Sequence, residues 1–204
     1  MKIFKYKSYA EYKEVQTKAN KRKLDWVWVD VNTLHEIAEY VINYNPDVAF
    51  GLCHGTRRGE EQKRLMEDFL SLGKKVKVLG TEISNTATQF EHTIEWDFHE
   101  VKKEWIDNVD FIYSNSFDHT YDPEKCLDAW MSCLNEKGLC IIDWSRQDEA
   151  CSGVEHPSVD PFIASLEEHK NIIEKKYKIV DIVESHSINL GQDYGSVFIF
   201  IKKK

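Results

Sequence analysis

Five apolar runs with strand-like composition are interspersed with four helical patterns along this chain. The strand-like runs lie at residues 47–53, 75–81, 93–98, 109–114 and 138–144, and helical patterns lie at residues 32–44, 59–72, 123–135 and 160–175. Two further strand-like runs, 177–185 and 195–203, are predicted to pair antiparallel near the C-terminus. Alternation of this kind requires parallel strands joined by crossover helices. The sequence therefore predicts a three-layer, Rossmann-like α/β fold: a mostly parallel sheet, helices on both faces and an antiparallel C-terminal strand.

Composition limits the classes of protein to which the chain can belong. It has 204 residues, 42% of them hydrophobic, and a formal net charge of −8. These values predict one globular domain over residues 1–204 and disfavour a nucleic-acid partner, which selects for a basic face. No apolar run is long enough to span a bilayer, and the first residues lack the apolar core of a signal peptide. The five cysteines are odd in number and without a metal-binding spacing, so we expect reduced thiols in a cytoplasmic protein with no membrane partner.

Residues 1–30 are rich in lysine and aromatic side chains and are predicted to form an N-terminal extension or cap. Within them, residues 9–23 have the composition of a polar helix and residues 24–29 that of a strand. Trp26 and Trp28 could line a cleft or pack on the edge of the domain. The sequence leaves open whether the extension covers a substrate or packs against a second copy of the chain in a homodimer.

A glycine-punctuated loop follows the first strand of the predicted sheet. Gly51, Gly55 and Gly59 recur every fourth residue, a spacing that matches neither G-x-G-x-x-G nor a phosphate-binding loop. Glycines let a ligand approach the backbone closely, and the first turn of the next helix offers free N–H groups. We interpret the segment as a ligand-binding loop; the alternative is a tight turn between strand and helix.

Polar residues also follow the carboxyl ends of the later strands, where open α/β sheets bind their ligands. Glu82 follows the second strand, Asp97 and Phe98 end the third, and residues 115–119 follow the fourth. Glu82 lies about twenty residues past the loop, the spacing at which dinucleotide-type folds place an acid on a ribose diol. A carboxylate can accept two hydrogen bonds from such a diol. The alternative for Glu82 is a solvated strand end.

After the fifth strand, residues 145–159 are polar and irregular. They contain Gly153 and Pro157, and Pro161 follows them closely. This composition is typical of an active-site loop or lid.

The order of these landmarks resembles that of the Rossmann-like, class I methyltransferases that use S-adenosylmethionine. The first strand of that family ends in D-x-G-x-G-x-G, and residues 51–57 stand in the same place. The family's acid falls on Gly51, its first glycine on Cys53, its second on Gly55 and its third on Arg57. The first motif is therefore degraded, whereas the later landmarks match in order and spacing. The resemblance covers roughly residues 34–203.

The resemblance implies S-adenosyl-L-methionine as the cofactor. It places Glu82 on the ribose hydroxyls and Asp97 on the adenine amino group, with Phe98 or Trp96 stacked beside the ring. The residues that it assigns to the cofactor are Gly51, Cys53, His54, Gly55, Thr56, Arg57, Glu82, Ile83, Asp97, Phe98, Asn115 and Ser116. Arg57 could bind the methionine carboxylate or an anionic substrate.

The same resemblance puts Asp118 and His119 opposite the methyl group. An attacking oxygen or nitrogen that carries a proton needs a base, and histidine titrates near neutral pH. We therefore expect Asp118 and His119 to be catalytic, with His119 as the general base; the alternative for Asp118 is a turn cap. Asp118, His119, Asp143 and His156 lack a recognised metal-ligand spacing, so no metal is expected.

The expected activity is methyl transfer from S-adenosyl-L-methionine to the oxygen or nitrogen of a small-molecule acceptor. The degraded first motif leaves a second possibility, a non-catalytic, degenerate Rossmann-like protein that acts through protein contacts. The acids at Glu82 and Asp97 argue against it, because a fold without its ligand has no need of both. A nicotinamide enzyme would prefer G-x-G-x-x-G, and a serine hydrolase would need G-x-S-x-G. The sequence does not identify the acceptor.

Overall fold

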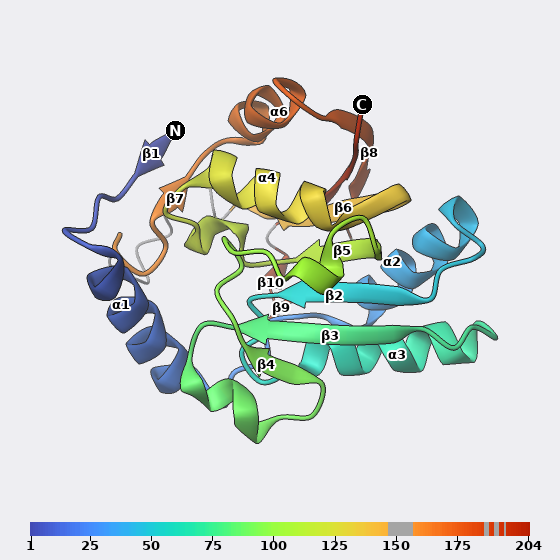
Figure 1. Cartoon of the computed structure of the whole chain (residues 1–204), viewed down its shortest axis with the longest axis horizontal. Coiled ribbons are helices and arrows are strands. Elements are labelled where there is room, and N and C mark those ends of the chain that lie inside the picture. The colour runs from blue at the N-terminus through green and yellow to red at the C-terminus, as the bar shows by residue number, and fades with distance from the viewer. Residues whose placement is uncertain (147–156, 186–187, 190–191, 194) are drawn as a thin grey trace.

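A computed structural model describes residues 1–146, 157–185, 188–189, 192–193 and 195–204. Within them, seven strands form one central sheet in the order β4-β3-β2-β5-β6-β11-β8 (Figure 1). Strands β2 to β6 run parallel, whereas β11 pairs antiparallel with both β6 and β8. The strands are β2 Phe50–His54, β3 Lys77–Glu82, β4 Thr93–Glu95, β5 Val109–Ser114, β6 Leu134–Trp144, β8 Lys178–Glu184 and β11 Val197–Lys202. The fold predicted from the alternation of strands and helices is confirmed.

Helices cover both faces of this sheet and complete the three layers. The α-helices are α1 Tyr9–Arg22, α2 Val31–Tyr44, α3 Glu60–Ser71, α4 Pro123–Cys133 and α6 Leu166–Glu174, and the 3₁₀ helices are η1 Asn85–Gln89, η2 Lys103–Trp105 and η3 Phe117–His119. On one face, Leu34 of α2 and Phe69 of α3 join Phe111 of the sheet in one apolar cluster. On the other face, Trp130 of α4 and Ile173 of α6 belong to a second cluster. Among the described residues, no helix combines the length and apolarity needed to cross a membrane.

Local sequence signals fix where several helices begin. Asp122 accepts a hydrogen bond from the Lys125 N–H at 3.1 Å, and Pro123 occupies the first turn of α4. Ser165 and Glu168 form a capping box at the start of α6. These caps set the ends of the loops between β5 and α4 and before α6, and both loops contribute to the site described below.

The strand order reverses between β2 and β5. Strand β2 pairs with β3 on one side and with β5 on the other, so His54 is aligned with Thr81 and Cys53 with Tyr113. The connection from β2 goes to β3, whereas β5 is reached only after the chain has passed through β4. Ligands of open α/β sheets bind outside the strand carboxyl ends at such a reversal.

The N-terminal residues pack at this same edge. The arrowheads of β2 and β3 point towards α1 (Figure 1). Strand β1, Lys2–Ile3, pairs antiparallel with β7, Phe162–Ile163, and the Phe4 N–H donates to the Pro161 carbonyl at 2.8 Å. The prediction of a helix over residues 9–23 is confirmed by α1. The N-terminal extension is therefore attached to the loop before α6.

Two predicted elements differ from the structure. Residues 24–29 form no strand: Trp26 and Val27 are exposed, and the Trp26 carbonyl accepts a hydrogen bond from the Arg57 guanidinium at 2.9 Å instead of from a neighbouring strand. The helix predicted from residue 160 begins only at Leu166, because residues 162–163 pair with β1. Most of the lid predicted at 145–159 lies outside the described residues.

The cysteines of the described residues are buried and free. Cys53, Cys126, Cys133 and Cys140 lie in the apolar interior and form no disulfide with one another. Burial raises the pKa of each thiol, so none of the four is poised to act as a thiolate nucleophile. Cys151 is outside the described residues.

Candidate functional site

A cleft of about 520 Å³, partly open to solvent, lies at the carboxyl ends of the parallel strands. One wall carries predicted site residues from four different segments: Gly55, Arg57, Glu82, Ile83, Asp97, Phe98, Ser116 and His119. The opposite wall is α1 with its C-cap residue; α1 contributes Tyr12, Gln16, Ala19 and Asn20, and the C-cap is Lys23. The sequence reasoning missed this second wall. The sequence does contain a sign of this wall, because its residues are spaced three or four apart and therefore lie on one face of a helix.

The glycine loop makes a tight turn through left-handed backbone conformations. Gly55 has φ +75°, and a Cβ there would lie 2.5 Å from the Ser116 Cβ. The Ser116 hydroxyl donates to the Gly55 carbonyl at 3.1 Å, so the two segments touch at this point. Arg57 stands where the methyltransferase motif has its third glycine, yet it adopts φ +45°. The backbone therefore keeps a left-handed turn that glycine normally provides, although the sequence motif is degraded.

Replacing Gly55 by alanine is expected to lower the free energy of unfolding by about 1–3 kcal/mol, because the new methyl group would combine a left-handed backbone with the Ser116 clash. Gly73→Ala is the matched control: Gly73 has φ +77°, but no atom lies within 4 Å of its added Cβ. Denaturant unfolding of both variants separates the two effects. Equal losses would show that the contact with Ser116 costs nothing.

Glu82 ends β3 and faces the cleft with both carboxylate oxygens engaged on the protein side. Oε2 accepts from the Arg57 N–H at 3.1 Å, and Oε1 accepts from the Ser84 N–H at 2.9 Å. Burial raises the pKa of Glu82, against the effect of these hydrogen bonds. Each carboxylate oxygen has a second lone pair, so the group can still accept two hydrogen bonds from a ligand.

Asp97 follows β4 and has an oxygen without a partner. Its Oδ1 accepts from the His99 N–H at 2.9 Å and from His99 Nδ1 at 2.7 Å. Its Oδ2 is buried and accepts no hydrogen bond of ordinary length among the described residues, although the Tyr9 hydroxyl interacts with the carboxylate and helps to lower its pKa. Burial by itself would raise the pKa of Asp97, but the hydrogen bonds and charge of His99 hold it below its ordinary value. An ionised carboxylate with a free, desolvated oxygen at a cleft is suited to a ligand N–H donor.

Other predicted cofactor residues lie behind the cleft wall. Gly51 leaves room for the Phe111 ring, which would lie 2.2 Å from an added Cβ, and Cys53 is fully buried in β2. His54 is held by Thr81 Oγ1 at 2.8 Å and stacks on Trp130 with ring centroids 5.0 Å apart. Burial lowers the pKa of His54 to about 3, so its ring is neutral. These three residues shape the strand that carries the loop.

Thr56 and Asn115 are likewise set back from the cleft. Thr56 is buried, and its hydroxyl has no partner among the described residues. The Asn115 side chain donates to Glu61 Oε1 at 3.4 Å. His119 lines the cleft. Asp118 lies beside His119 but does not line the cleft itself.

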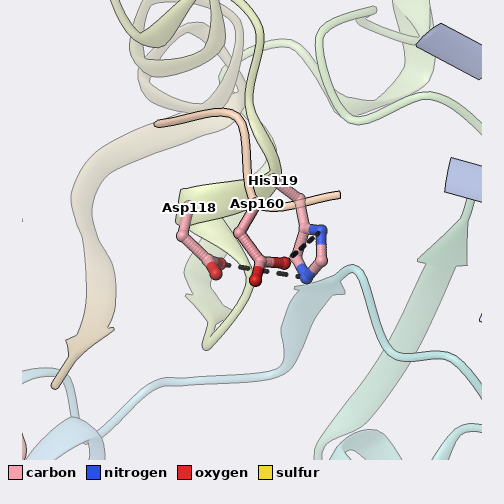
Figure 2. A group of neighbouring side chains, drawn as sticks. All are labelled: Asp118, His119 and Asp160. Carbon is pink, nitrogen blue, oxygen red and sulfur yellow. Dashed lines mark ion pairs between the residues drawn. The ribbon is translucent and has the colours of Figure 1, made fainter. Parts of the chain in front are cut away.

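Asp118 and His119, the residues predicted to be catalytic, lie next to a third titratable side chain, Asp160 (Figure 2). Asp118 Oδ1 lies 4.0 Å from His119 Nε2, and Asp160 Oδ1 lies 3.8 Å from His119 Nδ1. Burial, and then the negative charge of Asp160, raises the pKa of Asp118. The sequence reasoning missed Asp160 because it placed residue 160 in a helix.

Donor atoms of Asp118, His119 and Asp160 lie within 4.8 Å of one another. Such a group could surround a cation, but His119 Nδ1 already lies 2.8 Å from the Val159 carbonyl, and Lys23 supplies a positive charge nearby. We therefore assign no metal here. Of the other residues weighed for a metal, Asp143 accepts from the Tyr113 hydroxyl at 3.2 Å, and His156 is outside the described residues.

Comparisons with known proteins find the same architecture. No family model matches the sequence, and no curated protein matches it. Among solved structures, the Burkholderia thailandensis 1,6-didemethyltoxoflavin-N1-methyltransferase with S-adenosylhomocysteine has a TM-score of 0.69 at 12% identity, over 98% of this chain and 92% of that one. The plantazolicin methyltransferase BpumL in complex with a triazolic desmethylPZN analog and S-adenosylhomocysteine has a TM-score of 0.67 at 12% identity, over 96% and 98%. A third match comes from a complex between the Haloferax volcanii Trm112 methyltransferase activator and a putative methyltransferase. It has a TM-score of 0.66 at 15% identity, over 95% of this chain and 97% of that one.

The chain has the class I methyltransferase fold. This agrees with the resemblance found in the sequence, and it accounts for the antiparallel β11 between β6 and β8. In this methyltransferase fold, the cleft with Glu82 and Asp97 lies beside the strand reversal, where an α/β sheet binds its ligand.

Proposed function

We propose that this protein transfers a methyl group from S-adenosyl-L-methionine to the oxygen or nitrogen of a small-molecule acceptor. The observation that carries the proposal is the pair of acids at the ends of adjacent strands. Glu82 and Asp97 both face one cleft, and Asp97 Oδ2 is a buried acceptor without a partner. Structural neighbours with S-adenosylhomocysteine act on small molecules, which supports an acceptor of that kind.

The cleft fits the proposed cofactor in three respects. Asp97 Oδ2 suits the amino group of adenine, and Phe98 adds an apolar surface for the ring. The remaining lone pairs of Glu82 suit the two ribose hydroxyls. Gly55 has no side chain, so a ligand can approach the loop backbone.

His119 is the proposed proton acceptor. When bound, the cofactor supplies an electrophilic methyl sulfonium, so the protein has to align the acceptor, exclude water and remove a proton. His119 lines the cleft, and α1 closes the cleft from the other side. Burial lowers the pKa of His119, which keeps its imidazole neutral at physiological pH and able to accept a proton.

The alternative hypothesis of a non-catalytic protein was based on the degraded glycine motif. The left-handed conformation of Arg57 weakens that argument, because the loop keeps its turn without the third glycine. The buried, unpartnered oxygen of Asp97 also speaks for a bound ligand. We therefore favour the enzyme over the degenerate protein.

Calorimetric titration tests the proposal through the adenine contact. Wild-type protein is expected to bind S-adenosylhomocysteine about tenfold more tightly than S-inosylhomocysteine, in which a carbonyl replaces the amino group facing Asp97. Asp97→Asn is expected to remove this preference, because its amide N–H₂ can take the place of Oδ2 while Oδ1 still accepts from His99. An unchanged preference in the variant would show that Asp97 does not bind the adenine.

A further inference from the structure

We propose that Gln16 of α1 is a positioning residue that keeps the neutral imidazole of His119 protonated on Nδ1, leaving Nε2 free to accept a proton. The inference rests on the proposed role of His119 as the base and extends it to a residue that reaches the site from the N-terminal helix. Gln16 is 6% exposed and lines the cleft.

The neighbours of Gln16 fix the orientation of its amide. The amide nitrogen lies 2.9 Å from the Val159 carbonyl and 3.4 Å from the Ser158 carbonyl. Carbonyl oxygens only accept hydrogen bonds, so the nitrogen has to face them. The amide oxygen then faces His119 Nδ1, at 3.0 Å. A flipped amide would bring oxygen against two carbonyl oxygens and is disfavoured.

His119 Nδ1 therefore has acceptors on its side of the ring. It lies 2.8 Å from the Val159 carbonyl and 3.0 Å from the Gln16 oxygen. Among the described residues, Asp118 Oδ1 lies 4.0 Å from Nε2, which is longer than a hydrogen bond. A neutral imidazole carries one proton, and these contacts place it on Nδ1. The lone pair is left on Nε2.

Gln16 also connects the base to the N-terminal extension. It bridges α1, η3 and the segment 158–160, while the Tyr12 hydroxyl donates to the His119 carbonyl at 3.2 Å. The Tyr6 hydroxyl donates to the Ser158 carbonyl, and β1 pairs with β7 just beyond. The tautomer of His119 thus depends on α1 and residues 158–163 being docked together.

The charges around His119 come from five segments of the chain. Asp118 neighbours it on η3, Asp160 follows Val159, and Lys23 is the C-cap of α1. Arg57 of the glycine loop and Glu82 at the end of β3 lie across the cleft. Gln16 is neutral, so it can orient the ring without adding to this field. A glutamate at position 16 would add a negative charge beside Nδ1 and favour the imidazolium.

Nitrogen NMR of ¹⁵N-histidine-labelled protein reads the tautomer directly, with no acceptor or cofactor present. The His119 signals are assigned by their loss in His119→Asn. Wild-type His119 is expected to be protonated on Nδ1 above its pKa. Gln16→Leu should populate the Nε2–H form. The variant lacks the amide oxygen that accepts from Nδ1 and the amide nitrogen that holds the Val159 carbonyl in place. Lys18→Ala, on the exposed face of α1, should match the wild type.

Gln16→Glu retains the size of the side chain and provides a second readout. Its carboxylate cannot donate to the Val159 and Ser158 carbonyls, but it still presents an oxygen and now a negative charge to Nδ1, so it should move the His119 titration midpoint upward by about one pH unit. Wild-type His119 protonated on Nε2, or an unchanged tautomer in folded Gln16→Leu, would overturn the proposal. An unshifted midpoint in Gln16→Glu would also overturn it. None of these results depends on S-adenosylhomocysteine binding, so a failure of the proposed methyl transfer would be recognised separately.

Discussion

Replacement of Glu82 by alanine is expected to weaken S-adenosylhomocysteine binding by about 10- to 150-fold. The basis is the loss of a charged hydrogen-bond partner, worth about 1.5–3 kcal/mol. The carboxylate also accepts from the Arg57 and Ser84 N–H groups, so its removal loosens the loop that lies against the ligand. Isothermal titration calorimetry measures the change in dissociation constant.

Glu95→Ala is the matched control for this variant. Glu95 lies on the neighbouring strand at the same register as Glu82, but its side chain is exposed and pairs with Lys13 at 3.0 Å. It should bind S-adenosylhomocysteine like the wild type. Thermal unfolding without ligand reports how much of the Glu82→Ala effect is structural. A dissociation constant unchanged by Glu82→Ala would remove Glu82 from the site.

Replacement of His119 by alanine is expected to lower kcat by about 10²- to 10⁴-fold, the usual contribution of a general base. The affinity for S-adenosylhomocysteine should stay within a few-fold, because Glu82 and Asp97 hold the proposed cofactor from other strands. His35→Ala is a suitable control, since His35 lies on α2 and faces Asp68 and Glu39. Equal losses of kcat and affinity in His119→Ala would mean that His119 is structural.

The pH profile of the wild type checks the same role. The base acts in its neutral form, and burial lowers the pKa of His119 below its ordinary value. Activity should therefore be level through neutral pH and fall only as the pH drops through this lowered pKa. His119→Ala should lose this acidic limb. A limb that persists in the variant would belong to another group.

The sequence was informative where local pattern decides structure. The period of the apolar residues set the order of strands and helices, and the position of Glu82 and Asp97 at the carboxyl ends of their strands placed both in the cleft. The glycine loop was harder to interpret because its motif is degraded. Only the structure shows that Arg57 adopts the left-handed conformation itself.

The rest of the site depends on contacts between distant parts of the chain. Gln16 meets His119 across 103 residues and Val159 across 143 residues, and neither contact leaves a periodic signal. Asp160 reaches the site because β1 pairs with β7, which also delays the start of α6. Residues 24–29 have strand-like composition but find no partner strand, because their neighbour is the glycine loop. Tertiary packing overrode composition at each of these points.

Thermal unfolding with and without S-adenosylhomocysteine, with NADH as the control, is the measurement to make first. A ligand that binds the folded protein at 100 times its dissociation constant stabilises it by about 2.7 kcal/mol, which raises Tm by about 5–10 °C for a chain of this size. Our proposal predicts such a rise with S-adenosylhomocysteine and none with NADH. No rise with either ligand, or a rise with NADH alone, would contradict the assignment of a methyltransferase cofactor to this cleft.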